Sequence, residues 1–323
     1  MHSREDKLDS FLTSPSDLKI TTMHLFVYII VRTLLCWMQA CSDRMIERFS
    51  SFLAWLANDV FKLRRAVIVE NLSAVYPQLN AAQQHELARQ MWRSLVLMCC
   101  EIAQAPRRIN RYSWRDYLEL RNIDALVTAL LDRRPTILLS GHFGNFEIAG
   151  FAAGLFGFPS FTIARPLDNP KLNIFFNTFR GMHGQFILPK RGVADQVTNL
   201  LQSGATLTVL GDQADSISGI ELDFLGRKAT CHKAIALFAM NSNSNMVVAT
   251  AVRQSQCMIF NLACIDVLDV MQLEGTDRSI RGVTQWYNQQ LENQIRRTPH
   301  QYWWLHRRWK ARRKRRRHNL TKG

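Results

Sequence analysis

The chain has 323 residues, carries a formal net charge of +15 and is 47% hydrophobic. This length is sufficient for one large domain with its own core, and the hydrophobic content excludes a chain that is disordered throughout. A positive excess of this size indicates an anionic partner, such as nucleic acid, an acidic membrane surface or a phosphorylated substrate.

The cysteines and histidines give no sign of a metal centre. The number of cysteines, seven, is odd, and no two of them have the C-x-x-C spacing of a zinc site. His183, His232 and His300 have no further ligand at metal spacing. We therefore expect reduced, buried thiols in a cytosolic compartment, and neither a metal nor a cofactor.

Residues 1–22 are polar with mixed charge, and the following segment, residues 23–42, is strongly apolar. Its run 23–40 is about long enough to cross the hydrocarbon of a bilayer as a helix. Arg32 near the middle is costly there, so the segment either spans the membrane or lies partly in the interface with Arg32 snorkelling. The acidic Glu5 and Asp9 argue against a cleaved signal peptide. We expect a membrane anchor helix at 23–42.

Residues 49–61 place apolar side chains at helical spacing. We favour an ordinary core-facing helix, and the alternative is an amphipathic helix on the membrane surface. In the second case Lys62, Arg64 and Arg65 lie next to lipid headgroups. A long amphipathic helix is predicted at residues 80–103, with Pro106 ending it.

From residue 136 onward, short apolar runs alternate with helical patterns. The predicted strands are residues 136–140, 160–164, 185–188, 205–210 and 246–253. The predicted helices are residues 145–155, 169–182, 193–202, 232–241 and 278–296. This alternation predicts an α/β fold with a mixed, largely parallel central sheet flanked by helices, in one domain at residues 43–309. A basic tail, 310–323, follows, and we expect it to bind anionic lipids. One basic tail is weak support for nucleic acid, which we do not expect as a partner.

The candidate active site is the heptapeptide GHFGNFE at residues 141–147, which follows a predicted strand. Ligands of α/β sheets bind outside the carboxyl ends of strands. His142 and Glu147 there form a natural acid–base pair, in which Glu147 orients the imidazole and His142 takes a proton from a substrate hydroxyl. A histidine with a purely structural role is the alternative. Asn145 serves either to stabilise an oxyanion or to cap the following helix.

Several motifs in the same order resemble the lauroyl/myristoyl acyltransferases of lipid A biosynthesis, a branch of the H-x4-D/E glycerolipid acyltransferase superfamily. The matching positions are GHFGNFE at 141–147, Arg165-Pro166 with Asn169, Arg180 with Gly184, Asp212-Gln213, Phe224 with Gly226 and Thr230, and the stretch 299–308. The resemblance covers roughly residues 20–310, and the joint order is far more specific than any one motif.

The resemblance implies a glycerolipid acyltransferase-like fold and an acyltransferase that moves groups other than aminoacyl groups. The donor would be an acyl carrier protein thioester or acyl-CoA, and the acceptor a hydroxyl of a glycolipid, most simply a lipid A precursor. His142 would be the general base, and the enzyme would work at the cytoplasmic face of the inner membrane.

Four further residues are candidates for substrate binding. Arg165 suits a phosphate, with a surface ion pair as the alternative. Arg180 has a similar role or lies on a solvated helix face. Asp212 either orients a substrate hydroxyl or caps a helix, and Gln213 accompanies it in the shared motif.

The residues after Gln213 are not the Gly/Arg-rich stretch associated with lipid A enzymes, so the acceptor stays open. Another glycolipid, such as a mannosyl phosphoinositide, or an ornithine aminolipid is an alternative acceptor. A hydrolase, and a membrane-tethered protein that binds anionic ligands, are further alternatives.

Overall fold

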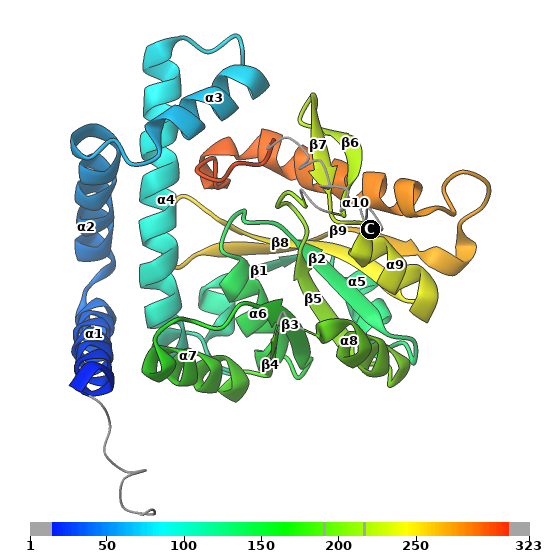
Figure 1. Ribbon diagram of the computed structural model, residues 1–323, viewed down its shortest axis with the longest axis horizontal. Coiled ribbons are helices and arrows are strands. Elements are labelled where there is room, and N and C mark those ends of the chain that lie inside the picture. The colour runs from blue at the N-terminus through cyan, green and yellow to red at the C-terminus, as the bar shows by residue number, and fades with distance from the viewer. Residues whose placement is uncertain (1–14, 190–191, 216–217, 310–323) are drawn as a thin grey trace, which may run out of the picture.

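The computed structural model describes residues 15–189, 192–215 and 218–309 (Figure 1). The start of the predicted polar segment, residues 1–14, and the basic tail, 310–323, lie outside the described residues. The described part contains a seven-stranded sheet in the order β1-β9-β8-β2-β5-β3-β4 and a separate β6-β7 hairpin.

All neighbours in the seven-stranded sheet are parallel except β8 and β9, which pair antiparallel. The strands are β1 Leu118–Arg121, β2 Thr136–Ser140, β3 Ser160–Ala164, β4 Gln185–Pro189, β5 Thr206–Leu210, β6 Ile220–Phe224, β7 Arg227–Cys231, β8 Asn245–Arg253 and β9 Phe260–Asp269. The predicted mixed, largely parallel sheet is confirmed. Strands β1 and β9, which the sequence analysis did not predict, extend it at one edge.

The helices surround this sheet. They are α1 Pro15–Ala40, α2 Asp43–Trp55, η2 Leu56–Val60, α3 Arg65–Val75, α4 Ala81–Arg108, η3 Trp114–Asp116, α5 Ile123–Leu131, α6 Phe146–Leu155, α7 Pro170–Met182, α8 Val193–Gln202, α9 Lys233–Ser242, η4 Val270–Gln272, α10 Ile280–Arg297 and η5 Pro299–Gln301. Pro106 does not end α4 as predicted. It lies in the last turn, where few backbone bonds remain to be lost, and the N–H of Ile109 still reaches the carbonyl of Ala105 at 2.7 Å.

Alternate residues of the central strands face different layers, as a pleated strand requires. Ile137 and Leu139 of β2 belong to the main core with α8, α9 and α10, whereas Leu138 packs with residues of α5. Helix α6 lies on the same side as α5, because residues of both helices line one pocket together with Leu138. The sheet is therefore covered by helices on both faces.

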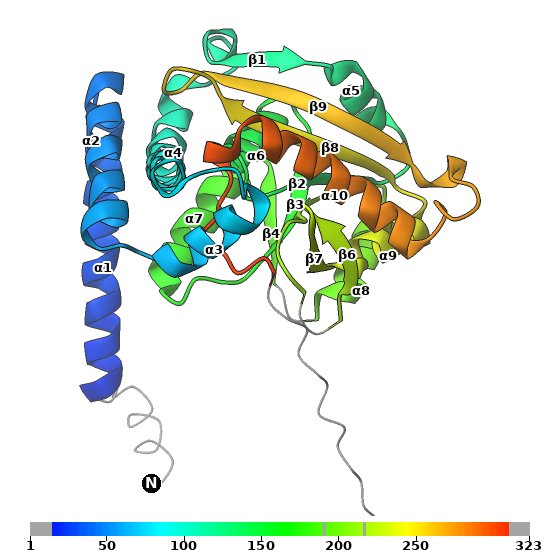
Figure 2. The same cartoon turned by 90° about the horizontal axis from the view of Figure 1, so that it is seen from above.

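Helices α1 and α2 lie along one side of the molecule, next to α4 (Figures 1 and 2). The amide of Gln104 in α4 donates to the carbonyls of Met38 and Cys41, at 3.0 Å each, and Arg108 pairs with Asp43. Helix α4 thus connects the N-terminal helices to the part of the chain that contains the sheet.

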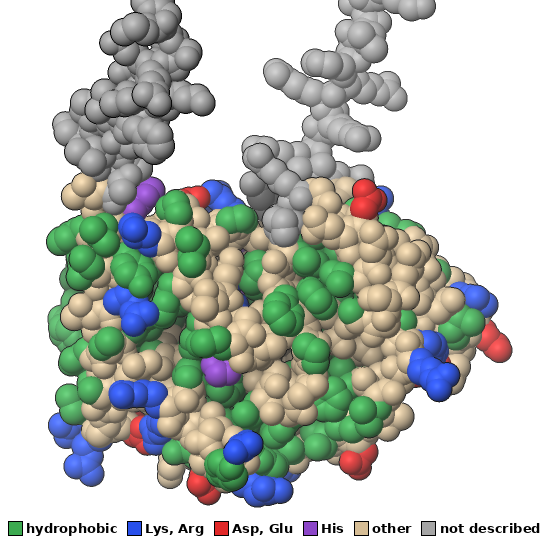
Figure 3. Space-filling model, turned by 90° about the horizontal axis from the view of Figure 1, so that it is seen from below, with side chains coloured by type: hydrophobic (Ala, Val, Ile, Leu, Met, Phe, Trp, Pro, Cys, Tyr) green, Lys and Arg blue, Asp and Glu red, His purple; other side chains and the backbone are tan. Residues whose placement is uncertain are grey.

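Within α1, residues Thr22–Ala40 are long and apolar enough to cross a membrane, and only 6% of the most apolar window is buried. Hydrophobic side chains with interspersed Lys and Arg cover this end of the molecule (Figure 3, left). The guanidinium of Arg32 lies 4.4 Å from the ring centre of Phe175 in α7. Arg32, the costly cation of the sequence analysis, therefore has a partner within the protein.

The prediction that residues 49–61 form a core-facing helix holds for Phe49, which packs against a core cluster, but is wrong for the other aromatic residues. The side of α2 that packs inward consists of Ile46, Ser50 and Ala54. Phe52 and Trp55 are 53% and 44% exposed. Small residues allow α2 to lie close to α4, and the large side chains are left on the outer surface, as in an interfacial helix.

Candidate active site

Strands β2 and β5 are parallel neighbours in which Ser140 pairs with Leu210. His142 and Asp212 each lie two residues beyond these positions, so the two loops bring them together at the carboxyl edge of the sheet. The Nδ1 atom of His142 lies 2.8 Å from Oδ1 of Asp212. The Asp212 side chain is fully buried, and that of His142 is 14% exposed.

The two side chains shift each other's pKa. Burial opposes the charged imidazolium, but the attraction and the hydrogen bond of the Asp212 carboxylate outweigh it, so the pKa of His142 is raised. Burial also opposes the charged carboxylate, yet His142 and the nearby His306 hold the pKa of Asp212 below its usual value. Asp212 therefore stays ionised, and His142 keeps its proton to a higher pH than a free imidazole does.

The hydrogen bonds fit one tautomer of His142. When Nδ1–H donates to the acceptor-only carboxylate of Asp212, Nε2 carries the lone pair. The amide Nε2 of Gln213 lies 3.2 Å from that atom and donates to it. The basic nitrogen, Nε2, thus points away from Asp212 and toward the Gln213 amide, whose place a hydroxyl group can take.

The loop that carries His142 is bound to the C-terminal motif. Phe143 forms a β-bridge with Tyr302, and the N–H of Trp303 donates to the carbonyl of His142 at 3.1 Å. The Trp303 and Phe146 rings lie 4.9 and 5.4 Å from the His142 ring. The ring of His306 lies 6.3 Å away, and burial lowers its pKa. Two motifs that are far apart in the sequence therefore build one site.

Gly144 is required by the path of this loop. Its φ is +61°, and an added Cβ would lie 2.2 Å from the carbonyl oxygen of Ala251. The next N–H, that of Asn145, donates to the same oxygen at 2.7 Å. Any side chain at position 144 would push the loop away from β8 and displace His142.

Two roles were considered for Asn145, oxyanion stabilisation and helix capping, and the structure shows helix capping. Its Oδ1 accepts from the N–H of Ile148 at 3.2 Å, and its Nδ2 donates to Oε2 of Glu101 at 2.9 Å. The residue is fully buried. Its amide is therefore engaged in holding the start of α6 against α4.

Glu101 and Arg253 form a buried ion pair beside Asn145. The Nη2 atom of Arg253 lies 2.8 Å from Oε2 of Glu101, and both side chains are at most 6% exposed. Arg253 also donates to Ser94 through Nη1 at 2.9 Å, and its backbone N–H donates to Gln301 at 3.0 Å. This network joins α4, β8 and the C-terminal motif below the histidine loop, and the sequence analysis did not find it.

The predicted pairing of Glu147 with His142 differs from the structure. Glu147 is the second residue of α6, so its side chain points away from the loop, toward α7. There it forms an ion pair with Arg180, whose Nε lies 3.2 Å from Oε2. Asp212, which was predicted to contact the substrate or cap a helix, is instead the carboxylate that holds the histidine.

Arg165 and Arg180 do not join the histidine site. The Arg165 guanidinium is 79% exposed and pairs with Asp168 at 2.8 Å, which is the surface ion pair considered as the alternative. Arg180 is held by Glu147 as described. Of the predicted site residues, His142, Asp212 and Gln213 come together, Asn145 supports them, and the other three lie apart.

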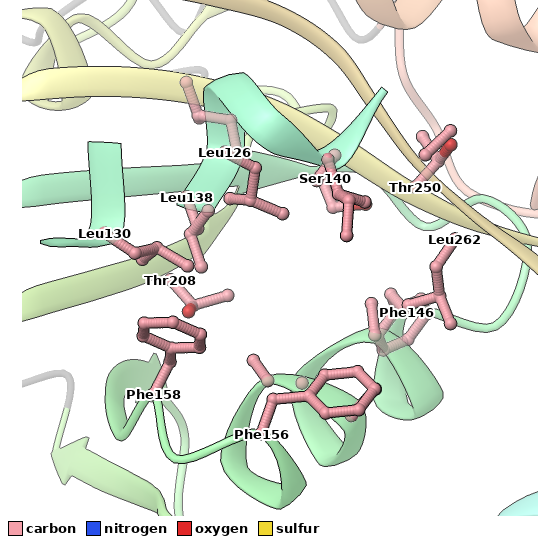
Figure 4. A pocket seen from close by; sticks show the side chains of 18 of the residues that line it. Leu126, Leu130, Leu138, Ser140, Phe146, Phe156, Phe158, Thr208, Thr250 and Leu262 are labelled. Atoms are coloured by element: carbon pink, nitrogen blue, oxygen red, sulfur yellow. The ribbon is translucent and has the colours of Figure 1, made fainter. Parts of the chain in front are cut away.

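An apolar pocket lies between the sheet and helices α5 and α6 (Figure 4). About 880 Å³ of space, part of it open to solvent, lies between its walls. Leu126, Leu138, Phe158 and Leu262 contribute to its wall. Ser140 and Phe146, which lie on either side of His142 in the sequence, also line it. The pocket suits a hydrocarbon chain whose head lies near the histidine.

No group of three or more metal-ligating side chains occurs among the described residues. Cysteines are also not part of the site. Cys231 is fully buried and lies 3.0 Å from Nη2 of Arg308. The site combines a carboxylate-held imidazole with an adjacent apolar pocket.

The structure is that of an α/β protein with a buried histidine–carboxylate pair at the carboxyl edge of its sheet. Comparison with known proteins identifies the family, because residues 13–311 match the model of the bacterial lipid A biosynthesis acyltransferases. The chain belongs to this family.

Two named proteins are similar to this chain. The lipid A biosynthesis palmitoleoyltransferase of Escherichia coli (strain K12) is 23% identical over 264 residues, which are 80% of this chain and 82% of that protein. The lipid A biosynthesis acyltransferase of Shigella flexneri shows the same identity and coverage. The chain is therefore a transferase of lipid A biosynthesis by family.

Proposed function

We propose that this protein transfers a fatty acyl chain from a thioester to a hydroxyl group of a lipid A precursor, with His142 as the general base. The observation that carries the proposal is the buried Asp212–His142 pair, whose free Nε2 lies at the carboxyl edge of the sheet beside an apolar pocket. Membership of the lipid A acyltransferase family supports the substrate class.

The proposed reaction needs no covalent acyl-enzyme. The acceptor hydroxyl replaces Gln213 at Nε2 of His142 and gives up its proton to this nitrogen as its oxygen attacks the thioester carbonyl. The tetrahedral intermediate then expels the thiolate, which takes the proton back from the imidazolium. The products are the ester and a free thiol, and His142 returns to its neutral state.

In this scheme Asp212 keeps the proton of neutral His142 on Nδ1 and stabilises the imidazolium. The sequence analysis had assigned this role to Glu147. Its full burial makes the charge interaction stronger than it would be in water. We assign to Glu147 and Arg180 the fastening of α6 to α7, since they contact each other across these helices.

The acyl chain is proposed to occupy the apolar pocket, with its carbonyl near Ser140 and Phe146. The donor is an acyl carrier protein thioester or acyl-CoA, because either one supplies a good leaving group. The acceptor and anionic membrane lipids are reached through the N-terminal helices, whose exposed apolar residues suit a bilayer. We place the anchor at residues 23–42, the catalytic domain at 43–309 and the active site at the cytoplasmic face of the inner membrane.

The experiment uses the purified full chain, an acyl thioester and a lipid A precursor in mixed micelles. Thiol release and acylated product are measured together, with and without the acceptor. We expect thiol release to match ester formation, and both to fall about 10²- to 10⁴-fold in His142→Ala. Thiol release at the same rate without the acceptor would show a hydrolase, and an unaffected His142→Ala variant would overturn the proposed base.

A further inference from the structure

Four cations converge on an open pocket that the proposed acyl transfer does not use. Its lining consists of Lys62, Arg64, Arg65, Ala66, Val67 and Arg307, and it has about 940 Å³ of empty volume. The cations come from two segments that are more than 240 residues apart in the sequence. Their meeting is thus a product of the fold rather than of one basic stretch.

The turn that presents the first three cations has an unusual backbone. Lys62 and Arg64 both have left-handed φ angles, of 50° and 53°, which cost energy for residues other than glycine. The two Nδ2 hydrogen bonds of Asn71, to the carbonyls of Trp304 (2.7 Å) and His306 (3.0 Å), fasten the following helix α3 to the C-terminal motif. The turn that carries the first three cations is therefore held in a fixed position relative to Arg307.

Within the part of the chain that the structure describes, this charge is not offset by an ion pair. None of the ion pairs formed between described residues includes Lys62, Arg64, Arg65 or Arg307. Four like charges around one pocket repel one another, and an anion bound between them relieves that repulsion. Guanidinium groups also match the geometry of a phosphate better than that of a monatomic anion.

The pocket is connected to the catalytic histidine by a short path. Arg307 directly follows His306, whose ring lies 6.3 Å from that of His142. The peptide between them is held by Asn71, and the N–H of Trp303 binds the carbonyl of His142. Adjacent residues of one motif, His306 and Arg307, therefore border the histidine site and the cationic pocket respectively.

We infer that this pocket binds a phosphate group on the headgroup of the glycolipid acceptor and so presents the acceptor hydroxyl to His142. The inference rests on the proposed function and adds a site for the acceptor to it. The neighbouring apolar residues favour a lipid-bound phosphate over a soluble one or an acidic protein. Phe61 and Leu63, which alternate with the cations, are 65% and 47% exposed and suit the acyl region below a headgroup.

The test removes charge from the pocket without touching the catalytic groups. Lys62→Gln/Arg65→Gln and Arg307→Gln are compared with Arg278→Gln/Arg297→Gln, which removes two exposed charges at the two ends of α10. Each variant is assayed with a phosphorylated lipid A precursor and with the same glycolipid after phosphatase treatment, both in zwitterionic micelles. Repeating the assays in micelles that contain an anionic phospholipid distinguishes the acceptor from bulk lipid.

We expect the pocket variants to raise KM for the phosphorylated acceptor about tenfold per cation removed, while kcat and the donor KM stay unchanged. The dephosphorylated acceptor should already have a raised KM with the wild type and lose little more in the variants. Equal effects on both acceptors, effects that appear only with anionic phospholipid, or a raised donor KM would overturn the inference. If the wild type transfers no acyl chain at all, the proposed function has failed instead.

Discussion

The N-terminal helices and the carboxyl edge of the sheet use opposite arrangements of polar and apolar groups. In α1, α2 and η2, large apolar side chains such as Phe26 and Trp55 are exposed, and small residues pack inward. At the ends of β2 and β5 the apolar surface is covered, and charged groups such as Asp212 and Glu101 are fully buried and paired. The first arrangement suits contact with lipid, and the second holds a base in one orientation.

This contrast predicts that substitutions at the two regions fail in different ways. The largest effect is expected for Asp212→Asn. An amide can donate to Nδ1, which favours the wrong tautomer and removes the charge that stabilises the imidazolium. We expect kcat to fall about 10²-fold or more while membrane binding stays unchanged. Steady-state kinetics and vesicle sedimentation measure the two quantities, and a kcat within threefold of wild type would contradict the proposed pair.

The pH dependence of kcat/KM tests the same pair, His142 and Asp212. The base must be neutral to accept a proton, so kcat/KM should rise as pH increases through the raised pKa of His142. Removing the Asp212 charge lowers that pKa, and the acid limb of the residual activity should move to lower pH. The stability that the ion pair contributes has the opposite sign, since it is present at low pH and lost as pH rises through the same pKa. An acid limb that does not move would show that another group controls it.

Substitution within the buried pair Glu101–Arg253 should lower the stability of the fold rather than the rate of the reaction. Glu101→Gln leaves the Arg253 guanidinium buried without its counter-charge, and we expect the free energy of unfolding to fall by about 3–5 kcal/mol. The matched control is Glu119→Gln, which removes the exposed partner of Arg121 and should cost less than about 1 kcal/mol. Equal denaturation midpoints for the two variants would contradict this difference.

A smaller and different effect is expected in the N-terminal helices. Phe52→Ser/Trp55→Ser should weaken binding to anionic vesicles about tenfold, since two half-exposed aromatic side chains lose their transfer into the membrane. Leu131→Ser, at an exposed position at the end of α5, is the control. Activity on a detergent-solubilised acceptor should be unchanged in both. Vesicle binding that is equal to wild type would show that this side of α2 does not face lipid.

Only a small effect on activity is expected for Glu147→Gln. This residue bonds to Arg180 rather than to His142, so kcat should fall less than tenfold, although α7 loses an ion pair that is only partly exposed. A loss as large as that of Asp212→Asn would contradict the division of roles between the two carboxylates.

The sequence predicted the α/β order of β2, α6, β3, α7, β4, α8, β5, α9 and β8 because each has a clear apolar period and a turn or cap beside it. It also located His142, Asp212 and Gln213. It failed on the partner of His142, since Glu147 is five residues away in the sequence but points to another helix. Asp212 is 70 residues away and becomes a neighbour only through the β2–β5 register.

Pairing between strands is a tertiary property that local periodicity does not contain. One signal was nonetheless present, because both strands are followed by glycine and then a polar residue, Gly141-His142 and Gly211-Asp212. When two parallel strands are neighbours in a sheet, the residues that follow their carboxyl ends lie close together. The Glu101–Arg253 pair offered no such signal, since both residues lie within otherwise ordinary helix and strand patterns.

The central claim is most directly tested by mass spectrometry of lipids from cells that carry the wild-type protein or His142→Ala. The account predicts that the variant is folded and membrane-bound, and that lipid A in these cells lacks one acyl chain, whose mass identifies the group transferred. Identical lipid profiles in cells that express both proteins at equal levels would contradict the account.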